Sequence, residues 1–278
     1  MGHVITKLMG GLGNQLFQLT AGLYVAEKVG RRLILDVSYY DQNQCHDGFC
    51  LSEIMDLDPL GIEVIRRPSR LVSPIVVREA EDGIDHAIRM CSRLPDWMGL
   101  QLRGYWQVAK FAEVMRHRLV SSLSGIESDY KKAFFLHFRR GDYLSAGNKE
   151  LYDVIPKNYY YDAINYVLKN HSNPRILVVS DDIEYAGQVI QALPEADYQV
   201  LQGTDTFSTF RMMTSCEGAV CANSSFSWWA AFLQRNSRCW ILPEKWDNIH
   251  PELAFQRWPR LSRVLPEGLV ICEGSSAE

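Results

Sequence analysis

The chain has 278 residues, of which 47% are hydrophobic and 22% are charged, enough to build one large or two smaller domains. The formal net charge of −4 gives no reason to expect nucleic acid or an anionic membrane as a bulk partner, although a local group of arginines can still bind a small anion. No apolar run reaches the ~18 residues of a transmembrane helix, and the start MGHVITKLMGGLGNQ lacks a signal-peptide pattern. We therefore expect a cytoplasmic protein with at most peripheral membrane association.

The first 36 residues predict a βαβ unit: an apolar strand at 4–8, a glycine-rich turn at 9–13, a helix at 14–29 and a strand at 32–36. The segment from 38 to 95 is polar, weakly periodic and interrupted by prolines, so loops, short helices and the odd strand are expected there. A strand at 100–106 and a helix at 111–123 follow.

The second half has a cleaner pattern of alternating strands and helices. It predicts strands at 134–138, 175–180, 198–201, 219–222 and 239–243, and helices that begin at 156, 183, 206 and 224. This rhythm is typical of a parallel sheet with helices on both faces. We expect two Rossmann-like α/β domains, 1–130 and 131–278, with the boundary near 125–132.

The seven cysteines include no CxxC pair, and we interpret them as ordinary thiols of a reducing cytosol. Cys45 and Cys50 flank His46, but this spacing fits no common zinc site.

The motif GGLGNQ (10–15) lies between a predicted strand and a predicted helix. Such a turn lets a ligand approach the backbone, and a helix N-terminus attracts negative charge. It is not the dinucleotide fingerprint, because Leu16 occupies the third glycine position, and no P-loop lysine follows. A plain tight turn is the alternative, but Asn14 and Gln15 place polar side chains at the ligand-facing end and favour a site.

The motif HFRRGDY (137–143) leaves the carboxyl end of a buried strand, where open parallel sheets bind ligands. Alternation along a strand places His137 and Arg139 on one side and Arg140 on the other. Arg139 suits a forked contact to phosphate oxygens. One arginine could instead pair with Asp142 for structural reasons alone.

Two further polar motifs follow strands, SDD (180–182) and NSSFSWWAA (223–231). The aspartates could hold a metal or read a base, and we expect one of them to cap the next helix instead. In the second motif, hydroxyls and helix-start N–H groups form a potential anion site, whereas Trp228 and Trp229 are expected to pack. A DLD string (56–58) also matches the DxD metal motif, but its irregular surroundings make it a weak candidate.

Together and in this order, the four strand-end motifs resemble those of the α-1,2-fucosyltransferases of bacterial surface-glycan and O-antigen pathways, glycosyltransferase family 11. The resemblance implies a GT-B architecture of two Rossmann-like domains with parallel sheets and an active site in the cleft between them. It also implies an inverting hexosyltransferase with GDP-β-L-fucose as donor, no metal or other cofactor, and a galactose-terminated oligosaccharide or lipid-linked glycan as acceptor.

Carried over to this sequence, the resemblance places the donor site in 131–278 and the acceptor site in 1–130. Arg139 would bind the β-phosphate, and His137 would contact the nucleotide. Asp181 would bind the guanine edge. The remaining assignments are phosphate contacts by the NSS segment and sugar or acceptor contacts by the glycine motif: Asn223, Ser224 and Ser225, and Gly11, Gly13 and Asn14.

Three questions stay open at the level of sequence. Asp142 is a candidate base for the acceptor hydroxyl, but it could only orient Arg139, and the leaving phosphate could take the proton itself. A GT-B transferase with another nucleotide sugar or linkage is the alternative enzyme. A glycan-binding protein on this fold is the non-catalytic alternative.

Overall fold

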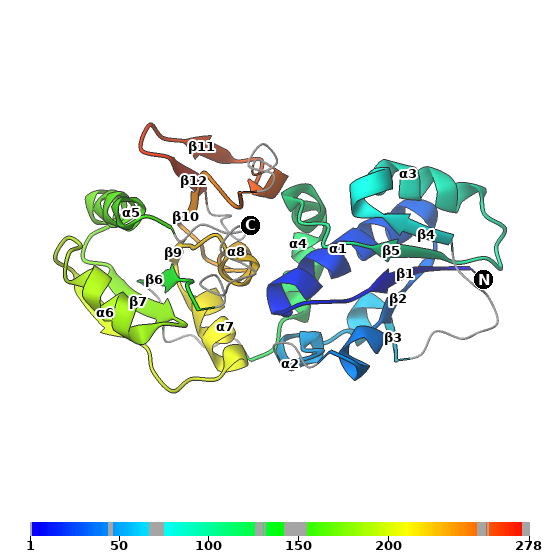
Figure 1. The fold of residues 1–278 in the computed structure, drawn as a ribbon, viewed down its shortest axis with the longest axis horizontal. Coiled ribbons are helices and arrows are strands. Elements are labelled where there is room, and N and C mark those ends of the chain that lie inside the picture. Colours follow the sequence, from blue (N-terminus) through cyan, green and yellow to red (C-terminus); the bar gives the residue numbers. More distant parts are fainter. Residues whose placement is uncertain are drawn as a thin grey trace. The chain divides into compact units, whose positions relative to one another are not determined.

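The computed structural model describes residues 2–43, 47–66, 75–125, 130, 132–141, 155–248, 254 and 256–273. The chain forms two compact units, Met1–Ser124 and Gly125–Glu278, each built from strands and helices in alternation (Figure 1). The sequence had suggested a boundary near 125–132.

The first unit holds a parallel sheet with strand order β3-β2-β1-β5-β4 among the described residues. Its strands are β1 (His3–Lys7), β2 (Arg32–Asp36), β3 (Glu63–Ile65), β4 (Ile75–Arg78) and β5 (Leu100–Arg103). Its α-helices are α1 (Leu12–Val29), α2 (Leu51–Ile54), α3 (Glu79–Arg93) and α4 (Ala109–Ser122), and its 3₁₀ turns are η1 (Ser38–Asp41) and η2 (Asp58–Leu60).

Helix α1 is the centre of this unit, with buried residues around most of its circumference, as expected of a helix enclosed by other elements. It packs against both α3 and α4. The crossovers β1–α1–β2 and β4–α3–β5 run in the same direction along the sheet, so right-handed connections put α1 and α3 on the same face.

The second unit has the strand order β11-β12-β10-β9-β6-β7-β8. Its strands are β6 (Ala133–Phe138), β7 (Arg175–Ser180), β8 (Asp197–Val200), β9 (Gly218–Val220), β10 (Cys239–Pro243), β11 (Ser262–Val264) and β12 (Leu269–Glu273). Its helices are α5 (Lys157–Asn170), α6 (Ile183–Ile190), α7 (Thr206–Ser215) and α8 (Ser225–Phe232).

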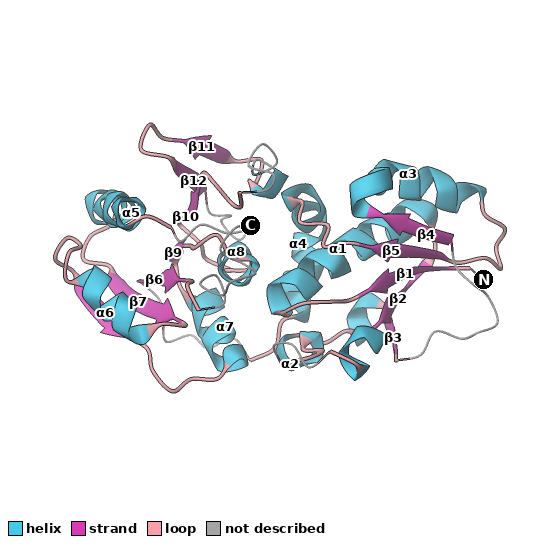
Figure 2. Ribbon diagram, in the orientation of Figure 1, coloured by secondary structure: helices cyan, strands magenta, loops and turns pink. Residues whose placement is uncertain are grey.

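The chain in this unit first runs outward from β6 through α5 and α6 to β8. It then crosses to β9 and runs the other way through α8 to β10. Right-handed connections therefore put α5 and α6 on one face and α7 and α8 on the other (Figure 2). The direction reverses between the neighbouring strands β6 and β9, which is the topological switch point of the sheet.

Aromatic side chains pack on both faces of this sheet. Phe138 packs on Tyr160 of α5 at 4.4 Å between ring centroids. On the α8 side, Trp228 and Trp229 are 0% exposed, which confirms that they pack. A cluster of aromatic rings with Phe232 and Trp240 surrounds them.

The sheet is not entirely parallel, contrary to the sequence prediction, because β12 runs antiparallel to both β10 and β11. The reason is local: β11 and β12 form a hairpin whose turn ends at Gly268, with φ of 76°. The N–H of Gly268 closes this turn on the carbonyl of Leu265 at 3.0 Å, and glycine adopts such a positive φ without a Cβ clash.

Within the described ranges, none of the helices combines the length and the apolar character that a bilayer crossing requires. Six described cysteines are free thiols and all six are buried: Cys50, Cys91, Cys216, Cys221, Cys239 and Cys272. Cys45 and His46 lie outside the described residues.

Candidate active site

Three of the four predicted motifs meet at one edge of the second sheet. HFRRGDY follows β6, SDD follows β7 and NSSF follows β9, and these strands are neighbours in the order β9-β6-β7. Arg139 contacts Asp181 across the β6 and β7 ends, and the rings of His137 and Phe226 lie 6.2 Å apart across β6 and α8. The motifs therefore line the carboxyl edge at the switch point, where ligands of open α/β sheets bind.

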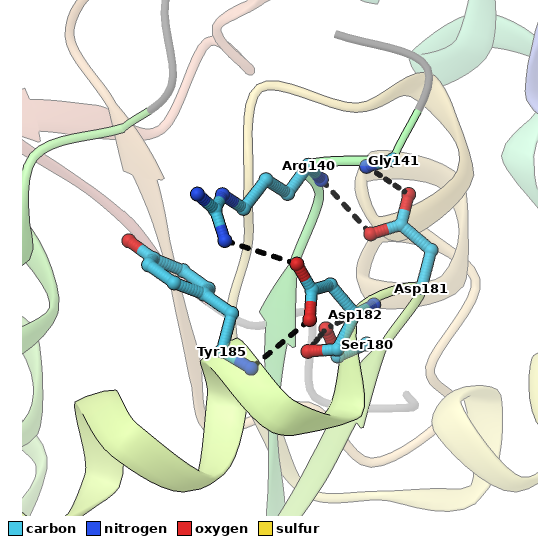
Figure 3. A network of polar contacts seen from close by, with 6 residues as sticks. All are labelled: Arg140, Gly141, Ser180, Asp181, Asp182 and Tyr185. Carbon is cyan, nitrogen blue, oxygen red and sulfur yellow. Dashed lines mark hydrogen bonds and ion pairs between the residues drawn. The ribbon is translucent and has the colours of Figure 1, made fainter. Parts of the chain in front are cut away.

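Asp181 fixes the backbone that follows β6 (Figure 3). Its Oδ1 accepts from the N–H of Arg140 at 2.9 Å, and its Oδ2 accepts from the N–H of Gly141 at 3.1 Å. Oδ2 also lies 3.0 Å from the Arg139 guanidinium. A carboxylate has about four acceptor directions, so these contacts occupy most of them. The guanine contact suggested for Asp181 stays a prediction.

Asp182 has the structural role expected of one member of the SDD pair. It is the N-cap of α6, and its Oδ1 accepts from the N–H of Tyr185 at 3.0 Å. Its Oδ2 pairs with Arg140 at 3.0 Å. The Arg140 guanidinium also lies 4.2 Å from the Tyr185 ring centroid, a distance typical of a cation–π contact. Arg140 is thus held against α6.

His137 is an electrically neutral group beneath this edge. It is 4% exposed, and burial, with a smaller effect of the Arg139 charge, lowers the pKa of His137 to about 3. Its Nδ1 atom is buried without a hydrogen-bond partner among the described residues. A buried nitrogen of this kind is costly unless something binds it, which makes it available to a ligand or an ordered water.

The NSS segment forms the start of α8. Ser224 is the N-cap and makes no capping hydrogen bond with its side chain in the described part of the chain. The N–H groups of the first turn lie at this end of the helix, which carries a partial positive charge. Ser225 is half-buried, and the amide of Asn223 donates to the Trp246 carbonyl at 3.0 Å. Asn223 thus anchors this segment to the loop after β10.

The glycine motif lies in the first unit and differs in detail from its prediction. Helix α1 begins at Leu12, so Gly13 is buried inside it, while Gly11 is the N-cap and has φ of −77°. The positive φ of this turn, 75°, belongs to Gly10. Asn14 is half-buried and accepts from Gln107 Nε2 at 2.8 Å.

Gln15, which the sequence analysis places at the ligand-facing end, is instead fully buried and links two segments of the chain. Its Nε2 donates to the carbonyls of Gly10 and Gly48 at 3.1 and 2.7 Å, and its Oε1 accepts from the N–H of Cys50 at 3.1 Å. These bonds join the glycine turn to a segment 33 or more residues away. Sequence alone gave no signal for this partner.

The remaining candidates are the proposed base and the possible metal ligands. Asp142, the candidate base, lies outside the described residues. In the DLD string, the Asp56 carboxylate accepts from the N–H of Asp58 at 3.1 Å at the start of η2. Over the described part of the chain, no three His, Cys, Asp or Glu side chains gather as a metal site would require.

Two contributors to the second-unit site were not predicted. Tyr185 supports Arg140, and Phe226 lies against His137 on one side and Phe210 of α7 on the other, with ring centroids 5.4 Å apart for the second pair. Phe226 stands inside the NSSFSWW motif, so its position was a signal that could have been used. Tyr185 carries no such mark.

Comparison with known proteins gives a consistent result. The family model described as "Glycosyl transferase family 11" matches residues 84–255. The O-antigen biosynthesis glycosyltransferase WbnK of Escherichia coli is 28% identical over 306 aligned residues, covering 91% of this chain and 99% of the relative. An α-1,2-colitosyltransferase of Escherichia coli is 25% identical and covers 95% of this chain and 100% of its own.

Among solved structures, the fucosyltransferase NodZ from Bradyrhizobium is similar with a TM-score of 0.53 and 11% identity, over 87% of this chain and 96% of that one. NodZ α-1,6-fucosyltransferase co-crystallised with GDP gives the same TM-score at 12% identity, over 87% of this chain and 95% of that one. At these identities the likeness concerns the fold, which is the GT-B arrangement of two Rossmann-like units.

Proposed function

The chain belongs to glycosyltransferase family 11, and we propose that it transfers L-fucose from GDP-β-L-fucose to the 2-hydroxyl of a galactose in a glycan acceptor, with inversion at the anomeric carbon. The enzyme is a glycosyltransferase that uses a GDP-sugar. The choice of fucose, the galactose 2-hydroxyl and the stereochemistry are the finer parts of the proposal. We further propose that the second unit binds the donor and the first unit binds the acceptor. We also propose that the reaction takes place in the cytoplasm.

The observation that carries the proposal is the meeting of three motifs at the switch point of the second sheet. There Arg139 stands 3.0 Å from Asp181, which holds it in position. The start of α8, where the N-cap side chain of Ser224 makes no capping bond within the described residues, follows the neighbouring strand β9. A guanidinium and a helix N-terminus are both suited to phosphate oxygens. The negative charge of a diphosphate leaving group bound there would be stabilised by fixed groups of the protein.

In the proposed reaction, the galactose O2 forms a bond to fucose C1 while the bond between C1 and the β-phosphate oxygen breaks. GDP leaves with the bonding electron pair, so charge grows on the β-phosphate as the transition state is approached. Arg139 and the α8 N–H groups stabilise that charge, and one such donor typically lowers the barrier by about 3 kcal/mol.

The proton of the acceptor hydroxyl needs a destination in the same step. His137 is an unsuitable carrier of positive charge, because its pKa lies near 3. Asp142 remains the candidate base from the sequence, and the departing phosphate is the alternative acceptor of this proton.

One observation supports a carbohydrate pathway that builds surface glycans: a relative that covers nearly the whole chain is an O-antigen biosynthesis glycosyltransferase. We propose a galactose-terminated oligosaccharide or lipid-linked glycan as the acceptor and at most peripheral membrane association.

The test is incubation with labelled GDP-fucose and a panel of galactosides, followed by NMR of the product. An α-1,2 linkage to galactose is the expected result. Transfer to another hydroxyl would overturn the linkage, and absence of transfer to every galactoside, with GDP still bound, would overturn the acceptor class.

A second donor deserves the same assay because one relative is a colitosyltransferase. GDP-colitose and GDP-fucose should be compared at equal concentration with the best acceptor. A higher kcat/KM for GDP-fucose supports the proposal. A higher kcat/KM for GDP-colitose would show that colitose, and not fucose, is the transferred sugar.

A further inference from the structure

The turn that follows β5 lies beside the glycine turn that follows β1. These two strands are parallel neighbours, with Thr6 opposite Leu102, so both turns leave the same edge of the first sheet. A Cβ atom built on Gly10 would lie 2.7 Å from Asn14 Nδ2 and 3.4 Å from Tyr105 Cε1. An amide and an aromatic ring therefore lie against the same glycine.

Gln107, two residues after Tyr105 in the sequence, completes this group. Its Nε2 donates to Asn14 Oδ1 at 2.8 Å, a contact between residues 93 positions apart. Tyr40 adds a second tie, since its hydroxyl donates to the Gly10 carbonyl at 2.8 Å. Two side-chain amides that bond to each other are held in fixed orientations, as a recognition site requires.

The backbone of this turn is unusual in two places. Gly104 has φ of 149° and Trp106 has φ of 52°. A positive φ in a bulky residue is rare and costs on the order of 1 kcal/mol or more. The strain is held by neighbouring contacts: Trp106 is 2% exposed, and the N–H of Tyr105 donates to the Glu79 carboxylate at 2.7 Å.

The result of this backbone path is the exposure of one aromatic ring. Trp106 is buried, while Tyr105, its neighbour, is 44% exposed next to the paired amides. Strained backbone tends to persist at functional sites, where it presents a side chain that ordinary geometry would not. The group formed by Asn14, Tyr105 and Gln107, here called the YQN platform, has this character.

The chemistry of the platform differs from that of the second-unit site. Its three side chains are uncharged at neutral pH, whereas the switch-point edge carries Arg139 and Arg140. A hexose has an apolar face of C–H groups and a rim of hydroxyls, which match an aromatic ring and amide groups respectively. Galactose offers a wider C–H face than glucose, because its 4-hydroxyl is axial.

We propose that the YQN platform binds the acceptor sugar, with the Tyr105 ring against the C–H face of the galactose and the amides of Asn14 and Gln107 bonded to its hydroxyls. This inference rests on the proposed function and adds the residues that select the acceptor. Tyr105 and Gln107 belong to no motif in the sequence.

The experiment compares Tyr105→Ala with the wild-type enzyme in steady-state transfer to a β-galactoside. The KM for the acceptor should rise about tenfold or more, which corresponds to about 1.4 kcal/mol of lost binding, and the preference for galactoside over glucoside should fall. The KM for GDP-fucose and the dissociation constant of GDP should stay within about twofold of the wild-type values, because Tyr105 belongs to the first unit and the donor is proposed to bind the second. A twofold change is well below the tenfold change that corresponds to about 1.4 kcal/mol. Tyr105→Phe, which keeps the ring, should recover most of the acceptor affinity.

Tyr161→Ala is the matched control, because Tyr161 is 47% exposed on α5 of the other unit. It should leave both KM values unchanged. If Tyr105→Ala melts well below the wild type, Gln107→Leu gives the same test of the acceptor KM without removing the ring.

The outcomes separate the two ideas. Wild-type enzyme that transfers sugar to no galactoside would overturn the proposed function. Active wild-type enzyme whose acceptor KM is unaffected in both Tyr105→Ala and Gln107→Leu would overturn the platform alone. A parallel loss of GDP affinity would also count against it, because the effect would then not be specific to the acceptor.

Discussion

Replacing Asp181 with Asn tests how the donor site is held together. The carboxylate accepts two backbone N–H bonds and lies 3.0 Å from the Arg139 guanidinium. An asparagine keeps one acceptor oxygen. Its NH₂ group, itself a donor, takes the place of the second carboxylate oxygen and cannot accept the hydrogen bonds made there. At least one charge-assisted bond is lost, and such a bond contributes about 1.5–3 kcal/mol. The Asp181 side chain is 24% exposed, so a value near the lower end, about 2 kcal/mol, is expected.

Asp182→Asn is the matched control, because it makes the same chemical change one residue away. Asn is as good an N-cap as Asp, so the cap on Tyr185 is kept and only the pair with Arg140, 29% exposed at Asp182, is weakened. We expect a loss of no more than about 1 kcal/mol for this variant.

The assay combines thermal unfolding with calorimetry of GDP and of inosine diphosphate, which lacks the guanine 2-amino group. Asp181→Asn should lower the melting temperature by about 4–8 °C and weaken both nucleotides, since Arg139 loses its positioning partner. If Asp181 also reads the guanine edge, the loss for GDP exceeds the loss for inosine diphosphate. An Asp181→Asn variant with the melting temperature and GDP affinity of the wild type would show that Asp181 does not hold the donor site together.

Three further predictions concern the same site. Arg139→Ala should lower turnover 10²–10³-fold, by roughly 3 kcal/mol of transition-state stabilisation, and Arg139→Lys should also be badly impaired because lysine lacks the fork; an alanine variant with more than about a tenth of wild-type turnover would contradict the role. EDTA should leave activity intact, whereas complete loss restored by manganese would point to a metal site. Because the pKa of His137 falls to about 3 on folding, the unfolded state gains a proton first as the pH drops through its ordinary value of about 6.5. The stability is therefore complete above that value and is lost below it, by about 2 kcal/mol between pH 7 and pH 5. His137→Gln should flatten this slope in denaturant titrations, and an unchanged slope would show that His137 does not cause it.

More of the helices and strands of the second unit than of the first could be predicted from sequence patterns. Buried strands such as Arg175–Ser180 are continuous apolar runs, and helices such as α5 carry their apolar residues at helical spacing. The polar residues at their ends could be located for the same reason. Once the strand order was known, the carboxyl ends of β6, β7 and β9 had to meet.

The elements that sequence missed are short, at an edge or interrupted. β3 and β4 have three and four residues at the two edges of the first sheet, too few for a periodic signal. Helix α3 contains Gly83 with φ of 70°, which interrupts its helical pattern. The hairpin of β11 and β12 pairs a three-residue strand with a five-residue strand, and three residues are again too few for a periodic signal.

The site shows the same division between local and tertiary information. Asp182 as a helix cap follows from its place before α6. The burial of Gln15 and its bonds to the segment near Cys50 depend on residues 35 positions away. The contact of Gln107 with Asn14 depends on the pairing of β1 and β5. No property of either side chain reveals it in advance.

A crystal structure of the enzyme with GDP would show whether the diphosphate binds where Arg139 and the start of α8 can stabilise its charge. The β-phosphate is expected to lie within hydrogen-bond distance of the Arg139 guanidinium and of the first-turn N–H groups of α8. A nucleotide bound away from the carboxyl ends of β6 and β9 would contradict this expectation.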